Sequence, residues 1–223
     1  MFQSGQTPIQ PGQSAPDFSV PAVHEDGTIS LSDYRGRTPL LLGLFRGLYC
    51  PFCRRALAQM AATSAHLKSL GVDSLAIVAT DVENARLYFK FRPTRMAIGA
   101  DPHLATHRSY GVPRPEPTPE LMQVMEKVHI NPTGELPAPL PPAAAGAALA
   151  ALDGYHMTPS DERDAEAQVT QLKGQFLIDR GGIVRWSNIE CGKEGPAGMG
   201  KFPSHDELVS AASIVIGGAP LKT

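Results

Sequence analysis

The sequence predicts an α/β protein in which helices flank a central β-sheet. Two apolar segments, 39–45 and 72–79, have the composition of strands that are buried on both faces. A helical pattern follows each of them, and this alternation of strand and helix favours parallel pairing. Segments 174–179 and 183–189, joined at Arg180-Gly181-Gly182, predict an antiparallel hairpin. We therefore expect a mixed sheet.

The smaller elements follow from local signals. The helix after the first buried strand should end before Gly71, because glycine is the usual residue just past a helix. Thr80 and Glu83 have the spacing of a capping box, and Asp101-Pro102 is typical of a helix start. The remaining expected elements are strands at 18–20, 28–31 and 96–100, a helical turn at 32–34, and helices at 80–91 and 101–110.

Residues 113–170 differ from the rest of the chain, since prolines interrupt them repeatedly and alanines follow. We interpret them as an insertion within a single domain that spans residues 1–223, and we expect the core to fold without them. Within the insertion the sequence favours helices at 120–128 and 143–152 and a short strand at 128–130. A second capping box, Ser204 to Glu207, predicts a final helix to about Ile216.

Composition excludes several classes of function. The formal net charge of −2 gives no basis for binding a nucleic acid, and no apolar run approaches the ~20 residues of a membrane span. The first residues lack the pattern of a signal peptide, so we expect a cytoplasmic protein. The three cysteines are too few for a disulfide scaffold, which favours a redox or metal role for the closely spaced pair.

Cys50 and Cys53 are the candidate catalytic residues. They lie in the first turn of a predicted helix, where free backbone N–H groups and the helix dipole stabilise a thiolate. Pro51 suits the first helical position, and Cys53 is close enough to form a disulfide with Cys50. Positive charge from Arg46, and from Arg54 with the adjacent Arg55, should lower the pKa of Cys50 further.

Other chemistry is less well supported. A structural zinc site needs about four ligands, and there is no second cysteine pair, so we expect no metal and no cofactor. Cys191 could serve as a resolving or an intermolecular thiol, although an incidental thiol is the simpler interpretation because Cys53 is a nearer partner for Cys50. His103 and His107 have a spacing that can bind metal, although a solvated helix face is the simpler interpretation.

The segment from Phe45 to Cys53, FRGLYCPFC, resembles the active-site segment of the alkyl hydroperoxide reductase/thiol-specific antioxidant branch of the thioredoxin superfamily. Segments 15–18, 31–36 and 176–185 extend the resemblance. It implies a thioredoxin-like fold with the insertion before the final hairpin, and a peroxidase. Cys50 would attack the peroxide and Cys53 would resolve the sulfenic acid, with Arg46, Tyr49, Pro51 and Arg54 in support. An external dithiol such as thioredoxin would restore the pair.

Three positions depart from the family pattern. Gly43 replaces a proline, Gly47 replaces a hydroxyl residue that binds the peroxide, and Lys173 precedes the final hairpin where thioredoxin-like proteins have a proline. Two alternatives therefore remain: a thiol–disulfide oxidoreductase acting on protein or small-molecule disulfides, and a non-catalytic module that binds a partner through the insertion. Whether the chain forms a homodimer stays open.

Overall fold

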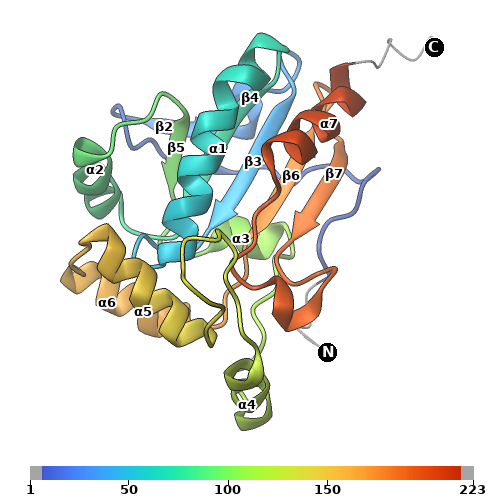
Figure 1. Ribbon diagram of the computed structural model, residues 1–223. Coiled ribbons are helices and arrows are strands. Elements are labelled where there is room, and N and C mark those ends of the chain that lie inside the picture. The colour runs from blue at the N-terminus through green and yellow to red at the C-terminus, as the bar shows by residue number, and fades with distance from the viewer. Residues whose placement is uncertain (1–6, 217–223) are drawn as a thin grey trace.

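The structure, a computed structural model, describes residues 7–216 and is built on a five-stranded mixed sheet in the order β5-β4-β3-β6-β7 (Figure 1). Strands β3, β4 and β5 are parallel, β6 runs antiparallel to β3, and β7 runs antiparallel to β6. The predicted mixed sheet and final hairpin are therefore confirmed. The strand bounds are β3 (Leu40–Phe45), β4 (Asp73–Val78), β5 (Ala97–Ala100), β6 (Gly174–Ile178) and β7 (Val184–Ile189).

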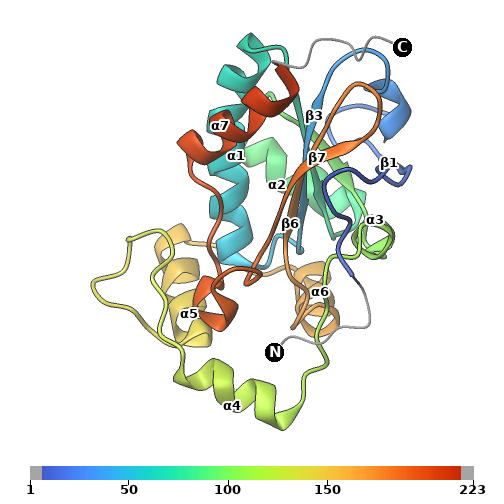
Figure 2. The same ribbon diagram turned by 90° about the vertical axis from the view of Figure 1, so that its right-hand side faces the viewer.

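Two apolar cores lie on opposite faces of the sheet, which explains why β3 is apolar throughout. Leu41 and Phe45 belong to the core beneath α1 (Pro51–Ser69), α2 (Val82–Phe91) and α7 (His205–Ile216). Leu40, Leu42 and Leu44 belong to the second core, with Tyr110 and Phe176. Figure 2 views the sheet nearly along its edge, with α1 and α7 on one side and α3 (Ala105–Ser109) on the other.

The first elements match their predictions closely. Strands β1 (Ser19–Pro21) and β2 (Thr28–Ser30) pair antiparallel, and the short helix η1 (Leu31–Asp33) follows them. Helix α1 ends before Gly71, whose φ of +79° is the left-handed conformation expected of a glycine just past a helix.

Two helix starts differ from prediction. Asp81, rather than Thr80, caps α2, because its side chain accepts a hydrogen bond from the Asn84 N–H. The helix expected from Asp101 begins only at Ala105, since Leu104 adopts a left-handed φ of 55°. Asp101 still accepts a hydrogen bond from the Thr106 N–H, at 2.7 Å.

The insertion forms three helices, of which α4 (Pro119–Lys127) and α5 (Pro142–Asp153) were predicted and α6 (Pro159–Ala167) was not. In place of the strand expected at 128–130 there is an isolated bridge between Ile130 and Leu140. Both views place these helices beyond the end of the sheet where α1 begins (Figures 1 and 2). The insertion therefore lies at the same end of the molecule as the two cysteines.

After the hairpin, a glycine-rich loop contains the short helix η2 (Gly195–Gly198), and the predicted cap of Ser204 and Glu207 opens α7. Within residues 7–216, no helix is both long enough and apolar enough to cross a membrane.

Candidate active site

Cys50 occupies the N-cap of α1, and Pro51 is the first residue of the helix. The Cys53 N–H donates a hydrogen bond to Cys50 Sγ at 3.3 Å, so an otherwise unpaired helix donor faces the sulfur. Both cysteines are free thiols, and their exposed fractions are only 3% and 0%. Local sequence thus produces the predicted arrangement, in which two adjacent thiols sit at the positive end of a helix.

The two thiols differ in acidity. Burial acts to raise the pKa of Cys50, but hydrogen bonding from Cys53 and the charges of Arg46 and Lys173 outweigh it and lower the pKa to about 6. Burial and the neighbouring Cys50 raise the pKa of Cys53 well above its ordinary value. At neutral pH the site therefore holds a thiolate on Cys50 and a protonated thiol on Cys53.

Arg46 belongs to a buried cluster of three charged side chains, which we call the Arg46 cluster: Arg46, Lys173 and Glu190. Their exposed fractions are 6%, 0% and 3%. Glu190 Oε1 lies 3.2 Å from Lys173 Nζ and 3.6 Å from Arg46 Nη2. Arg46 Nε and Nη2 have no hydrogen-bond partner among the described residues, so this guanidinium can still donate hydrogen bonds to another group.

Lys173 and Glu190 were missed by the sequence analysis as site residues. Lys173 directly precedes β6 and Glu190 directly follows β7. The Glu190 N–H donates to the Lys173 carbonyl at 3.0 Å, and the Lys173 N–H donates to Glu190 Oε2 at 3.1 Å. Because Gly174 pairs with Leu44 of β3, the hairpin also places Lys173 at the end of β3. There it lies beside residues 46–50, the turn between β3 and α1, which we call the active turn. A lysine immediately before the fully buried β6 was the available signal.

Arg54 has a different environment. Its Nη1 donates to the carbonyl oxygens of Leu48 and Tyr49, at 2.8 and 3.0 Å. Its Nε and Nη2 donate to Asp153 Oδ2, at 3.0 and 2.5 Å, and its guanidinium lies 4.0 Å from the centre of the Tyr155 ring. Arg54 therefore links the backbone of the active turn to Asp153 at the end of α5 through hydrogen bonds and an ion pair.

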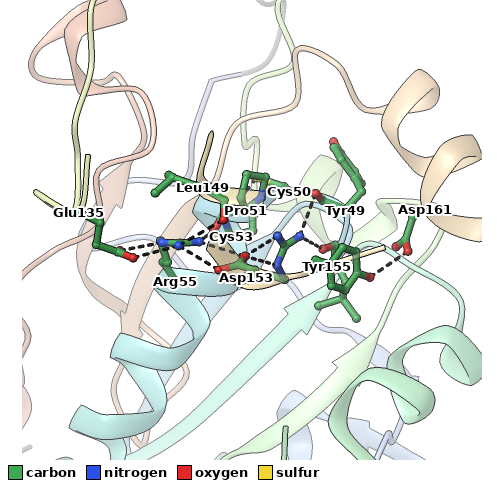
Figure 3. A network of polar contacts seen from close by, with 12 residues as sticks. Tyr49, Cys50, Pro51, Cys53, Arg55, Glu135, Leu149, Asp153, Tyr155 and Asp161 are labelled. Atoms are coloured by element: carbon green, nitrogen blue, oxygen red, sulfur yellow. Dashed lines mark hydrogen bonds and ion pairs between the residues drawn. The ribbon is translucent and has the colours of Figure 1, made fainter. Parts of the chain in front are cut away.

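Arg55 extends this second group of charges, which we call the Asp153 cluster: Arg54, Arg55, Asp153 and Glu135. Figure 3 labels Arg55, Asp153 and Glu135. Arg55 lies 2.9 Å from Asp153 and 2.7 Å from Glu135. Both arginines thus face carboxylates of the insertion. The sequence analysis expected them to act on the thiol, whereas the charges that lower the pKa of Cys50 are those of Arg46 and Lys173.

The insertion also packs directly on the active turn. Gln168 accepts a hydrogen bond from the Gly47 N–H at 2.8 Å and donates one to the Ala79 carbonyl at 2.6 Å. The hydroxyl of the half-buried Tyr49 donates to the Gln168 carbonyl at 3.4 Å. A Cβ added at Gly47 would lie 2.9 Å from the Tyr49 ring and 3.1 Å from Asp164, so a side chain at this position would require both neighbours to shift.

Gly43 is equally confined, because an added Cβ would lie 2.6 Å from the Phe45 ring and 2.8 Å from the Met60 sulfur. Packing therefore accounts for both glycines that depart from the family pattern near the cysteines.

A mainly apolar cavity of about 320 Å³ opens beside the active turn, between the insertion and the core. Arg46 and Phe52 line it from the core, and Glu126 is the one other charged residue in its wall. Most of the remaining wall is apolar and comes from α4 and the segment before it, the start of α5, the segment before β6 and the loop after η2: Pro115, Leu121, Met122, Met125, Pro141, Pro142, Ala143, Val169, Leu172 and Met199. Neither Cys50 nor Cys53 lines this cavity, and it reaches the active site through Arg46 and Phe52, so it can hold an apolar group next to Arg46.

The other candidates lie apart from this centre or carry no site. Cys191 is 7% exposed, burial raises its pKa to about 12, and it lines a groove of about 740 Å³ between β7 and α7 that does not include Cys50 or Cys53. His103 is exposed and precedes α3, whereas His107 is buried, so the expected shared, solvated face does not form. Among residues 7–216, no group of three or more His, Cys, Asp or Glu side chains is arranged to hold a metal ion.

These features define a thiol-based redox protein with a vicinal dithiol at the start of a helix. The sequence model of the AhpC/TSA family matches residues 11–187, and the chain belongs to that family. This confirms the resemblance found in the active-site segment. A search of the curated proteins gives no match.

Comparison with solved structures gives the fold. Peroxidoxin BcpB from Mycobacterium tuberculosis is 11% identical with a TM-score of 0.55, covering 96% of this chain and 99% of that one. The reduced 2-Cys peroxiredoxin of Plasmodium vivax is 14% identical with a TM-score of 0.52, covering 82% and 72%. A protein of Chlorobium tepidum assigned as the thiol:disulfide interchange protein DsbE is 18% identical with a TM-score of 0.51, covering 94% and 99%. The fold is thioredoxin-like, as predicted.

Proposed function

We propose that the protein reduces peroxides, with Cys50 as the attacking thiol and Cys53 as the resolving thiol. The Cys50 thiolate attacks one oxygen of the O–O bond and becomes a sulfenic acid, while the other oxygen takes up a proton and leaves as water or an alcohol. The Cys53 thiol then condenses with the sulfenic acid, which expels water and forms a disulfide. An external dithiol such as thioredoxin reduces that disulfide, and no cofactor takes part.

The observation that carries this proposal is the pairing of an ionised with a protonated thiol in one helical turn. Attack requires a thiolate, and the lowered pKa of Cys50 provides one at neutral pH. Resolution requires a nearby thiol that does not compete for the peroxide, and the raised pKa of Cys53 fits that role. The hydrogen bond from the Cys53 N–H to Cys50 Sγ keeps the two residues together.

The surroundings of the pair favour a small substrate over a folded protein. Cys50 is 3% exposed, which leaves little surface for a protein disulfide to reach. The cavity beside Arg46 and Phe52 would receive the apolar part of an organic hydroperoxide. The unpartnered Nε and Nη2 of Arg46 would donate to the peroxide oxygens, in place of the hydroxyl that Gly47 lacks.

A thiol–disulfide oxidoreductase is the second candidate. It would use the same pair without a peroxide step. Because stabilisation of the Cys50 thiolate favours the reduced pair, the Cys50–Cys53 disulfide would be a good oxidant. We place the peroxidase activity in the cytoplasm, because a reducing compartment supplies the external dithiol that its cycle consumes. Dimer formation and the non-catalytic use of the insertion are left to experiment.

The test compares wild type with Cys50→Ser, Cys53→Ser and the matched control Cys191→Ser. One equivalent of cumene hydroperoxide, an apolar organic hydroperoxide, should give wild type and Cys191→Ser a Cys50–Cys53 disulfide, seen by mass spectrometry as the loss of two hydrogens. Cys53→Ser should stop at a sulfenic acid on Cys50, and excess peroxide should carry it to the sulfinic acid. Cys50→Ser should react very slowly.

Equal loss of the rapid first step in both active-site variants would overturn the assignment of roles. A wild type that ignores peroxides but reduces or forms disulfides in a model peptide would replace the first proposal by the second. A wild type that reacts neither with peroxides nor with disulfides would point away from redox catalysis by the pair and toward a binding role.

A further inference from the structure

The Arg46 cluster has an unusual charge balance for a protein interior. Buried charges are costly unless they are paired, so a stable cluster normally sums to zero. Here Arg46 and Lys173 are cations, whereas Glu190 is the single carboxylate among the three. Burial acts to raise the pKa of Glu190, but Lys173, Arg46 and the Gly200 N–H outweigh it and lower the pKa, so this side chain is ionised. One positive charge is left without a carboxylate partner.

The bonds around Lys173 show that its position is imposed by the fold. Its Nζ contacts the Gly200 carbonyl at 3.3 Å and Glu190 Oε1 at 3.2 Å. Glu190 is held in turn by the Gly200 N–H at 2.7 Å and by the backbone N–H of Lys173 at 3.1 Å. Lys173 is fully buried, so neither charge can relax toward solvent. The hairpin and the loop after it thus hold an ion pair beside the end of β3.

The Cys50 thiolate supplies the missing negative charge. With it, two positive and two negative charges lie together in the buried site. When Cys50 forms a disulfide with Cys53, that anion disappears and the surplus positive charge returns. The cluster therefore stabilises the reduced, ionised pair more than the oxidised pair.

We propose that Lys173 and Glu190 are positioning residues that act through Cys50, and that their opposed charges set the reduction potential of the Cys50–Cys53 couple. Lys173 stabilises the thiolate and makes the disulfide more oxidising, and Glu190 limits this effect. The inference rests on the proposed function only in taking Cys50 and Cys53 as the redox pair. Other titratable groups near the site are Tyr49, Cys53, Asp164, Cys191 and Glu194.

The test uses substitutions with opposite expected signs. Lys173→Met removes a cation, so the pH midpoint of the Cys50 alkylation rate should rise by about one unit. The ratio of reduced to oxidised pair, measured at equilibrium with glutathione and its disulfide, should fall about tenfold. For a two-electron couple, tenfold corresponds to about 30 mV toward a more negative potential. Glu190→Gln removes an anion and should shift both quantities the other way. Lys173→Arg should restore most of the wild-type values.

Lys193→Met is the matched control, because Lys193 is exposed in the loop that follows β7 and its loss changes the net charge equally. It should leave both quantities within about twofold of wild type, since a charge in water is strongly screened. Circular dichroism and urea unfolding identify the variants that are folded. If Lys173→Met does not fold, Glu190→Gln alone decides the matter by the sign of its shift.

Shifts of the same sign in Lys173→Met and Glu190→Gln, no shift in either, or failure of both to fold would overturn the inference and leave the cluster with a role in stability alone. Both measurements are made without peroxide, so they are independent of the peroxidase proposal. A protein that ignores peroxides but shows the opposed shifts would keep this inference and lose that proposal.

Discussion

Two groups of arginine charge, one buried and one partly exposed, lie close to the same pair of thiols, and they differ in what neutralises them. In the Asp153 cluster, Arg54 and Arg55 face two carboxylates at hydrogen-bonding distance. In the Arg46 cluster, Arg46 lies 3.6 Å from a carboxylate that Lys173 also contacts, and two of its nitrogens have no hydrogen-bond partner among residues 7–216. The first group is neutral and the second has a surplus positive charge.

The difference teaches that proximity in sequence does not decide which arginine acts on a thiol. Arg54 is adjacent to Cys53, but its charge is already paired and its donors hold backbone carbonyls. Arg46 is four residues before Cys50, yet its charge lowers the pKa of that thiol. A cation influences a neighbouring thiolate in proportion to the charge that nearby anions leave uncancelled.

The largest effect should come from Arg46→Met. We expect the rate of the first reaction with peroxide at pH 7 to fall about hundredfold, because the variant loses a hydrogen-bond donor to the peroxide and part of the thiolate population. Stopped-flow measurement of Cys50 oxidation at several peroxide concentrations would show this. The comparison fails if Arg54→Met raises the pKa of Cys50 as much as Arg46→Met does.

Arg54→Met should instead act mainly on stability. It removes the ion pair with Asp153 and leaves the carbonyls of Leu48 and Tyr49 without their side-chain donor. We expect a loss of about 2–3 kcal/mol in the free energy of unfolding, toward the lower limit for breaking a buried pair because Asp153 is partly exposed. Urea unfolding measures it, with the exposed Arg37→Met as control. A loss no larger than that of the control would contradict the anchoring role.

The dependence of stability on pH should reveal the ionised thiol. The pKa of Cys50 in the folded protein is lowered from 9.0 to about 6, so the unfolded chain binds the extra proton between these values. This group's contribution is complete above pH 9 and is lost as the pH falls through about 6, with a slope of at most about 1.4 kcal/mol per pH unit. Cys50→Ser should flatten the curve in this window, and identical curves would rule out an ionised thiol.

The smallest effect should come from Asp153→Asn. This variant tests whether Arg54 and Arg55 have little effect on the pKa of Cys50 because carboxylates neutralise their charges. With the carboxylate removed, their charges are less completely cancelled, and the pKa of Cys50 should fall by a few tenths of a unit. Alkylation kinetics against pH can resolve such a shift. A rise in the pKa would mean that the insertion acts on the thiol by some route other than charge.

The prediction from sequence succeeded where a signal was local. The apolar β3, the glycine-bounded α1 and the Arg180-Gly181-Gly182 turn each depend on neighbouring residues, and so do the positions of Cys50 and Pro51 at the helix start. The family resemblance then implied the thioredoxin-like fold. These parts together account for the fold and the thiol pair.

What sequence reasoning missed depends on contacts between distant segments. Lys173 and Glu190 meet Arg46 only because of the hairpin register, and Asp153 meets Arg54 only because α5 returns to the active turn. Helix α6 was overlooked because it is polar and has little apolar periodicity, although Thr158 and Asp161 form a capping box that could have revealed it.

The close contact between Gly47 and Asp164 links two features that look unrelated in the sequence, the glycine at position 47 and helix α6. A serine or threonine at position 47 would bring its Cβ to 3.1 Å from Asp164 of α6, so the hydroxyl and this helix compete for one space. The two features should therefore vary together through evolution. Relatives with a short connection between β5 and β6 should carry serine or threonine at this position, and relatives that possess α6 should carry glycine.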